Sequence, residues 1–94
     1  MIETIICIRI PEASATLDEA MIQTNYKLKG EFKYDYPEHG HKWYERIRTP
    51  LYEKDGELYY FASILDWDSE DKIKAVSIGK IENKNNRNPE VILN

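Results

Sequence analysis

The chain has 94 residues, of which 41% are hydrophobic, 12% aromatic and 32% charged, and its formal net charge is −4. Disordered chains rarely contain so many aromatic residues, and proteins that bind duplex nucleic acid through its phosphates usually carry a basic excess. A single cysteine excludes an internal disulfide, so we expect one soluble, cytoplasmic domain over residues 1–94.

Residues 2–10 form an almost continuous run of β-branched apolar side chains that ends at Pro11. This pattern is typical of a strand near the centre of a sheet, covered on both faces. The run is too short to span a bilayer and has no basic leader, so we predict no membrane association. Cys7 lies in its middle, where burial disfavours the thiolate, so we expect an inert core cysteine rather than a nucleophile.

Residues 16–19 read Thr-Leu-Asp-Glu, which is the pattern of a helix capping box. The Thr16 hydroxyl can accept a hydrogen bond from the Glu19 backbone N–H, and the two acidic residues favour the positive end of a helix. We predict a helix over residues 17–25. A helix of this length is unstable alone, so it must pack on the sheet.

Three segments predict antiparallel strands. In residues 28–36, aromatic side chains alternate with charged ones, as in a half-exposed strand. Further strands are predicted over residues 43–51 and 58–65. Between them, Asp55-Gly56 predicts a two-residue hairpin turn in which both residues take positive φ.

The remaining chain is less regular. Residues 66–71 are acidic and turn-like, and residues 72–81 fit either a helix capped by Ser69 or a strand, with the β-branched residues favouring the strand. Residues 83–89 form a polar connector, and the short apolar segment 90–94 is expected to pair with a sheet. The predicted fold class is α+β, with a curved antiparallel sheet of about four to five strands and one short helix packed on one face.

The only two histidines, His39 and His41, flank Gly40 and raise the question of a metal site. Two imidazoles are too few ligands, and the sequence has no second half-motif with ligand spacing. The acidic segment 66–71 does not match a calcium-binding EF-hand loop, because Asp71 stands where that loop requires glycine. We therefore predict a solvent-facing turn around the histidines, no metal site and no cofactor.

The two-residue loop fixes the register of the hairpin and hence the composition of its two faces. It pairs Tyr52 with Tyr59, Pro50 with Phe61, Arg48 with Ser63 and Arg46 with Leu65. One face is the cleaner core face to place against the helix, and it carries Trp43, Ile47, Leu51, Tyr60, Ala62 and Ile64. The other face mixes aromatic residues with two arginines, and one helix cannot cover both faces.

This second face is the candidate partner-binding surface, because tyrosine, tryptophan and arginine dominate interface hot spots. The alternative is that Arg46 and Arg48 pair with neighbouring acids while the rings pack on the rest of the chain. The acidic turn is expected to steer encounter with a basic partner. The predicted partner-binding residues are Tyr44, Arg46, Arg48, Tyr52, Tyr59, Phe61, Trp67, Asp66, Asp68 and Glu70.

The sequence contains no nucleophile–base pair, phosphate loop or dinucleotide fingerprint, so we expect no enzyme activity and no catalytic residues. Its composition favours a small acidic module that binds a protein partner by surface contact, such as an accessory or inhibitor protein from a bacterium or mobile element. The weaker alternative is a single-stranded nucleic-acid-binding protein that stacks bases on the same face. A homodimer is also expected, with residues 90–94 extending a sheet in a second copy.

Overall fold

The computed structural model describes residues 4–37, 44–82 and 89–94. In these ranges the chain forms a six-stranded antiparallel sheet, in the order β1-β5-β4-β3-β2-β6, and one helix. The elements are β1 (Ile5–Ser14), α1 (Leu17–Gln23), β2 (Lys27–Pro37), β3 (Tyr44–Lys54), β4 (Glu57–Trp67), β5 (Ile73–Lys80) and β6 (Glu90–Leu93). The α+β class is confirmed, but the sheet has six strands instead of four to five. No helix in the described ranges is long and apolar enough to cross a membrane.

The hairpin between β3 and β4 has the predicted loop. Asp55 and Gly56 take φ values of 53° and 80°, and the strands pair in the predicted register at Tyr52 and Tyr59. Two successive residues with positive φ match the right-handed twist of the flanking strands, which is why an Asp-Gly pair favours this turn.

The ladder between β3 and β4 ends after Leu51 and Tyr60. Alternate pairs of such a hairpin exchange backbone hydrogen bonds, and Pro50 with Phe61 would be the next pair to do so. Proline has no N–H to donate, and the Phe61 carbonyl instead accepts a hydrogen bond of 2.7 Å from the Thr49 hydroxyl. The proline thus makes three predicted pairs wrong, namely Pro50–Phe61, Arg48–Ser63 and Arg46–Leu65.

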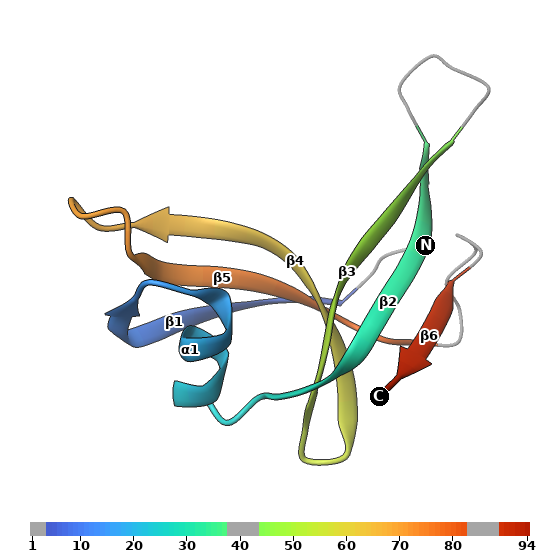
Figure 1. Ribbon diagram of the computed structural model, residues 1–94, viewed down its shortest axis with the longest axis horizontal. Coiled ribbons are helices and arrows are strands. Elements are labelled where there is room, and N and C mark those ends of the chain that lie inside the picture. Colours follow the sequence, from blue (N-terminus) through green and yellow to red (C-terminus); the bar gives the residue numbers. More distant parts are fainter. Residues whose placement is uncertain (1–3, 38–43, 83–88) are drawn as a thin grey trace.

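Beyond this point the sheet separates into two limbs (Figure 1). In the first limb β4 continues beside β5 and β1, and in the second limb β3 continues beside β2 and β6. The register of β4 against β5 shifts three times between Phe61 and Trp67, and such bulges bend a strand and increase its twist. The smoothly curved sheet that the sequence predicts is not evident, because the strands diverge instead.

β1 is an edge strand, which corrects the expectation that it lies near the centre of the sheet. An edge strand with one covered face alternates between buried and exposed side chains. Cys7 is accordingly exposed, so the predicted core cysteine is wrong. The strand also continues through Pro11, in a stretch with irregular register against β5. Proline is tolerated there because an edge strand need not donate every N–H to a neighbour.

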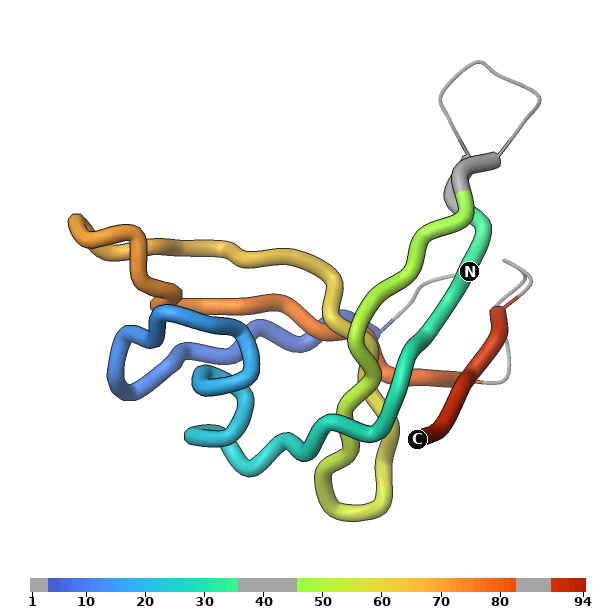
Figure 2. The backbone as a smooth tube through the Cα atoms, in the orientation of Figure 1, coloured from blue at the N-terminus to red at the C-terminus, as the bar shows by residue number. Residues whose placement is uncertain are grey.

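Helix α1 begins as predicted and ends two residues early. The Thr16 hydroxyl accepts a hydrogen bond of 3.2 Å from the Glu19 N–H. The helix ends at Gln23 because Asn25 takes a left-handed φ of 66°. The Gln23 side-chain amide donates to the Ser14 hydroxyl at 2.6 Å, which ties the helix to the end of β1. Figure 2 shows the chain leaving α1 and crossing in β2 to the second limb.

The first hydrophobic core lies between α1 and one face of the first limb. Its buried members are Ile10, Ala20, Met21, Tyr26, Tyr52, Ile73, Val76 and Ile78. Tyr59, Phe61 and Ile64 are partly buried and pack against it. Three of the aromatic residues predicted to be exposed on the hairpin, Tyr52, Tyr59 and Phe61, therefore belong to the core that α1 covers.

A second core lies on the opposite face of the hairpin. Its buried members are Phe32, Leu51 and Tyr60, and the Phe32 and Tyr60 rings stack with their centroids 4.9 Å apart. Both hairpin faces are thus covered, and the predicted assignment of the helix to the Leu51 face is wrong. The strand order explains this difference. β2 pairs with β3 and places Phe32 on the Leu51 face of the hairpin, whereas α1 follows β1 and lies over the Tyr52 face.

The last two strands agree with the sequence-based expectations. Residues 73–80 form β5, which confirms the strand alternative for this segment. The C-terminal apolar segment forms β6 and pairs with β2, where Gly30 allows the close approach of the Ile92 backbone. Because β6 pairs within its own chain, a dimer that exchanges this strand would first have to release it from β2. Self-association stays a prediction.

Candidate functional site

The predicted partner-binding residues are scattered over the molecule. Tyr52 is only 1% exposed, so the premise that it lies on an open surface is wrong. Its hydroxyl donates to Asp18 at 3.2 Å. Burial, and then the negative charge of Asp18, raise the pKa of Tyr52 well above its usual value. Tyr59 and Phe61 are half-buried against the same core. These rings stabilise the fold and present little surface to a partner.

The two arginines are engaged with carboxylates of their own limb. Arg46 bonds Asp35 at 2.9 Å and Glu90 at 3.2 Å, so it links β2, β3 and β6. The hydrogen bond that the Arg46 guanidinium donates to the Asp35 carboxylate is the main reason that the pKa of Arg46 is raised. Arg48 bonds Glu31 at 2.8 Å. Both arginines are thus paired with neighbouring acidic residues, which was the alternative to partner binding in the sequence analysis.

Two large apolar side chains are exposed at the end of the first limb. Leu65 is 50% exposed and Trp67 is 51% exposed, at the far end of β4 from the hairpin loop. In this part of β4 the side opposite β5 has no paired strand among the described residues. Of the predicted ring-bearing contact residues whose side chains are described, Trp67 is the most exposed. We call residues 65–72 the tip.

The tip has a defined turn conformation that is built around Asp68. The Asp68 carboxylate accepts backbone hydrogen bonds from Glu70 at 2.8 Å and Lys72 at 3.0 Å. The Asp68 N–H donates to the Lys72 carbonyl at 2.9 Å. These bonds close the connection between β4 and β5. Asp68 therefore has a structural role at the tip, whereas the sequence predicts it as a contact residue.

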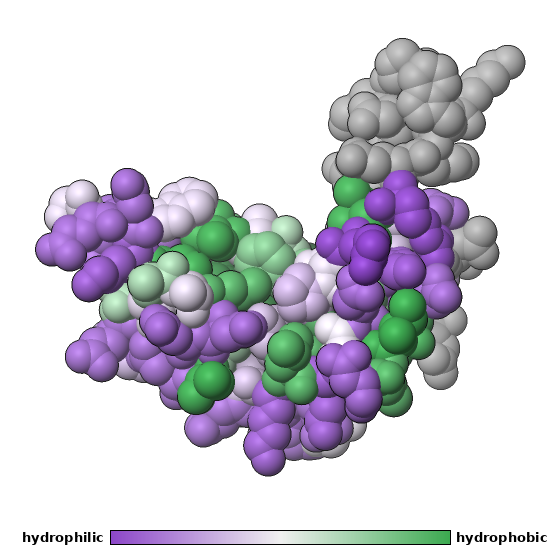
Figure 3. All heavy atoms as spheres, viewed as in Figure 1, coloured by the Kyte–Doolittle hydropathy of each residue, from purple (hydrophilic) through white to green (hydrophobic). Residues whose placement is uncertain are grey.

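The tip and the start of β5 carry an excess of negative charge. Four carboxylates and two ammonium groups lie between Asp66 and Lys74. Asp66 pairs with Lys74 at 4.0 Å and Glu70 with Lys72 at 3.6 Å, both at the surface. Such exposed ion pairs are weak and leave both partners available to other charges. Figure 3 shows hydrophilic surface at this end of the molecule.

Acidification should open the turn at the tip. The hydrogen bonds from Lys72 and Glu70 hold the pKa of Asp68 below its ordinary value. The stabilisation is therefore complete above the unfolded pKa of about 3.9 and is lost as the pH falls through the lower, folded pKa. A carboxyl-detected NMR titration should place the Asp68 midpoint below ~3.9, with amide shifts of Glu70 and Lys72 following it. A midpoint at or above that value, or the same amide titration in Asp68→Asn, would contradict the assignment.

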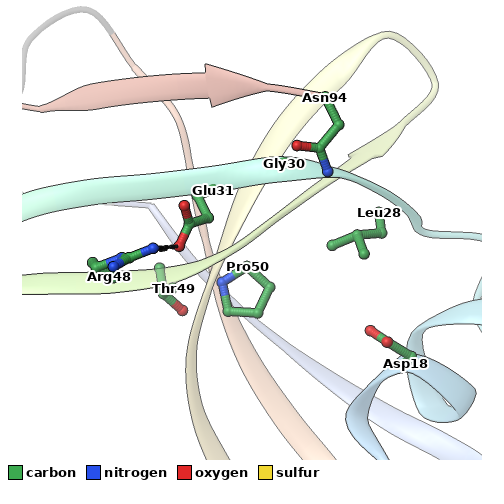
Figure 4. Close-up of a pocket in the computed structure, with 8 residues that line it drawn as sticks. All are labelled: Asp18, Leu28, Gly30, Glu31, Arg48, Thr49, Pro50 and Asn94. Carbon is green, nitrogen blue, oxygen red and sulfur yellow. Dashed lines mark hydrogen bonds and ion pairs between the residues drawn. The ribbon is translucent and has the colours of Figure 1, made fainter.

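The structure also contains a groove that the sequence did not predict (Figure 4). A hollow of about 450 Å³ lies between α1, β2 and β3, with Asp18 and Leu28 directed toward the space beside Pro50. The Glu31–Arg48 ion pair lies at its other side. Leu28 is the one residue whose type could have indicated this groove, because it is an apolar residue at the start of a strand. The residues that face Leu28 across the groove can be named only once the position of α1 is known.

His39, His41 and Trp43 lie outside the described residues, so the predicted solvent-facing turn around the histidines stays a prediction. Tyr44 begins β3, and its side chain is outside the description. Among the residues that the structure describes, no group of three or more histidine, cysteine, aspartate or glutamate side chains could hold a metal ion.

Comparison with known proteins gives no identity for this chain. No protein-family model, no curated protein and no solved structure matches it.

Proposed function

We propose that this protein is a non-catalytic protein-interaction module that binds a basic protein surface through its tip. The observation that carries the proposal is the exposure of Trp67 and Leu65 beside the acidic side chains of the β4–β5 turn. Tryptophan is among the residues that contribute most to binding free energy when a partner covers it. Surrounding acidic groups would steer a basic partner toward it.

The local structure supports this proposal in a second way. The hydrogen bonds of Asp68 hold the turn in one conformation before any partner binds. A preordered contact segment loses less conformational entropy on association than a flexible loop. Masking a basic surface on another protein would make this chain an accessory or inhibitor protein.

The hairpin face that carries Arg46 and Arg48 supports nucleic-acid binding less well than the tip supports binding of a protein. Arg46 and Arg48 are paired with carboxylates, and Tyr52 is buried. Phosphate contacts would have to displace those carboxylates, and among the described side chains of this face bases would find few exposed rings on which to stack. Nucleic-acid binding is therefore the competing function, and it predicts a different result in the capture experiment.

The experiment compares capture of partners by the immobilised wild-type chain, Trp67→Ala and Leu93→Ala, from nuclease-treated extract of the source cell. Leu93 is a matched control, because it is an exposed leucine on the second limb. A partner that depends on the tip should be captured by wild type and Leu93→Ala and lost with Trp67→Ala. With the purified partner, Trp67→Ala should raise the dissociation constant by about 30-fold or more, as for a hot-spot residue.

Three results would contradict the proposal. The first is equal affinity of Trp67→Ala and wild type for the purified partner. The second is capture of proteins from untreated extract only, with none captured from the nuclease-treated extract. The third is tight binding of a labelled single-stranded oligonucleotide at physiological salt that weakens steeply as salt is raised, because that dependence marks contacts to phosphate.

A further inference from the structure

A narrow slot adjoins the groove between α1 and β2 and is independent of the tip. It has a volume of about 190 Å³ and is lined by Asp18, Ile22, Tyr26, Leu28 and Tyr52. It adjoins the larger hollow of Figure 4, since Asp18 and Leu28 line both spaces. The slot has the size of one long side chain, and the neighbouring hollow reaches Gly30 and Pro50.

The walls of the slot are apolar and exposed. Ile22 on α1 is 70% exposed and Leu28 on β2 is 52% exposed. Figure 3 shows isolated hydrophobic groups at the lower end of α1 and near the start of β2, surrounded by hydrophilic surface. The ring of Tyr26 lines the slot as well and is itself mostly buried. Apolar side chains on two different elements, facing one cavity, can hold an aliphatic chain between them.

A carboxylate lies at one end of these walls. Asp18 accepts a hydrogen bond of 3.2 Å from the neutral Tyr52 hydroxyl. Within the described ranges Asp18 forms no ion pair, whereas Glu31, across the larger hollow, is paired with Arg48. The slot thus combines an apolar passage with a carboxylate that forms no ion pair among the described residues, although the Lys54 ammonium lies 4.9 Å from the centroid of the Tyr26 ring in its wall.

We propose that this groove binds a lysine or arginine side chain presented by an extended segment of another protein. The aliphatic stem would lie between Ile22 and Leu28, and the cationic end would bond Asp18. Long basic side chains have this division into an apolar stem and a charged head. A protein segment is the occupant, rather than a free amine, because the hollow extends beyond the slot and has room for neighbouring residues.

The test is an NMR titration of the ¹⁵N-labelled full chain with three blocked tripeptides. Acetyl-Ala-Arg-Ala-amide carries the cation, acetyl-Ala-norleucine-Ala-amide keeps an aliphatic stem without charge, and acetyl-Ala-Glu-Ala-amide reverses the charge. We expect saturable shifts at the amides of Asp18, Ile22 and Leu28 with the arginine peptide, with a dissociation constant of about a millimolar. The norleucine peptide should bind about tenfold more weakly and the glutamate peptide not measurably.

Two variants and one competitor decide the outcome. Asp18→Asn retains an oxygen for the Tyr52 hydroxyl, so the fold should persist while the arginine peptide binds about tenfold more weakly. Glu82→Gln removes an exposed carboxylate elsewhere and should bind as wild type does. The proposal fails if Asp18→Asn binds like wild type, if shifts spread over all acidic surfaces, or if spermidine binds the slot as tightly as the peptide. None of these measurements depends on Trp67, so either proposal can fail without the other.

Discussion

Replacing Tyr52 by alanine should lower the free energy of unfolding by about 3–5 kcal/mol, the range for truncating a large buried aromatic side chain. Tyr52 is 1% exposed within the first core and among the largest fully buried side chains. Its removal would leave a cavity beside Met21 and Tyr26 and would leave Asp18 without its hydroxyl partner. For a chain of this length, such a loss is a large part of the total stability.

Chemical denaturation followed by circular dichroism measures this effect. Trp67→Ala is the matched comparison, because Trp67 is 51% exposed and its truncation should cost less than about 1 kcal/mol. Tyr52→Phe separates the hydroxyl from the ring and should cost about 1 kcal/mol. If Tyr52→Ala and Trp67→Ala lower the free energy of unfolding equally, the ring of Tyr52 is exposed. That result would contradict the structure and agree with the sequence-based prediction of an open face.

The second large effect is expected at Gly79. A Cβ added there would overlap the ring of Tyr60, its cross-strand partner on β4. That ring cannot simply swing away, because it is 4% exposed and packs against Phe32 and Tyr34. Gly79→Ala should therefore force the second core apart and cost about 2–3 kcal/mol, as overpacked cores do.

A double-mutant cycle identifies the cause of that loss. In a Tyr60→Ala background the space above Gly79 is already empty, so adding Gly79→Ala should cost at least about 1 kcal/mol less than it does in wild type. Denaturation midpoints and slopes of the four proteins give the coupling free energy. If the cost of Gly79→Ala is the same in both backgrounds, the overlap with Tyr60 is not its origin.

The features predicted correctly from sequence are those that depend on local chemistry. Thr16 with Glu19 specifies the start of a helix through a hydrogen bond within four residues. Asp55-Gly56 specifies a turn because few residue pairs accept two positive φ values in succession. The strand at residues 73–80 follows from its β-branched side chains.

The errors concern partners that are distant in sequence. A β-branched run such as residues 5–10 fits both a central strand and an edge strand, and strand order decides between them. The absence of an N–H on Pro50 was visible in the sequence and could have indicated that the hairpin ladder stops there. The three register shifts in β4 depend on its pairing with β5, and no local pattern marks them.

The same division applies to the candidate site. The sequence placed Trp67 and the acidic turn beside it on the surface by residue type, and the structure leaves Trp67 exposed, but their binding role stays a prediction. It assigned Tyr52, Tyr59 and Phe61 to an open face, because it assumed that a single helix could cover only the opposite one. The slot beside Asp18 was missed because its walls come from α1, β2 and β3, whose packing only the folded chain defines.

Amide hydrogen exchange, measured on the protein alone and saturated with its purified partner, addresses the contact surface most directly. If the tip binds the partner, protection should be centred on residues 65–72, and β2 and β6 should exchange as they do in the free protein. Protection confined to the second limb, with the exchange at Trp67 and its neighbours unchanged, would contradict the assignment of the tip as the binding surface.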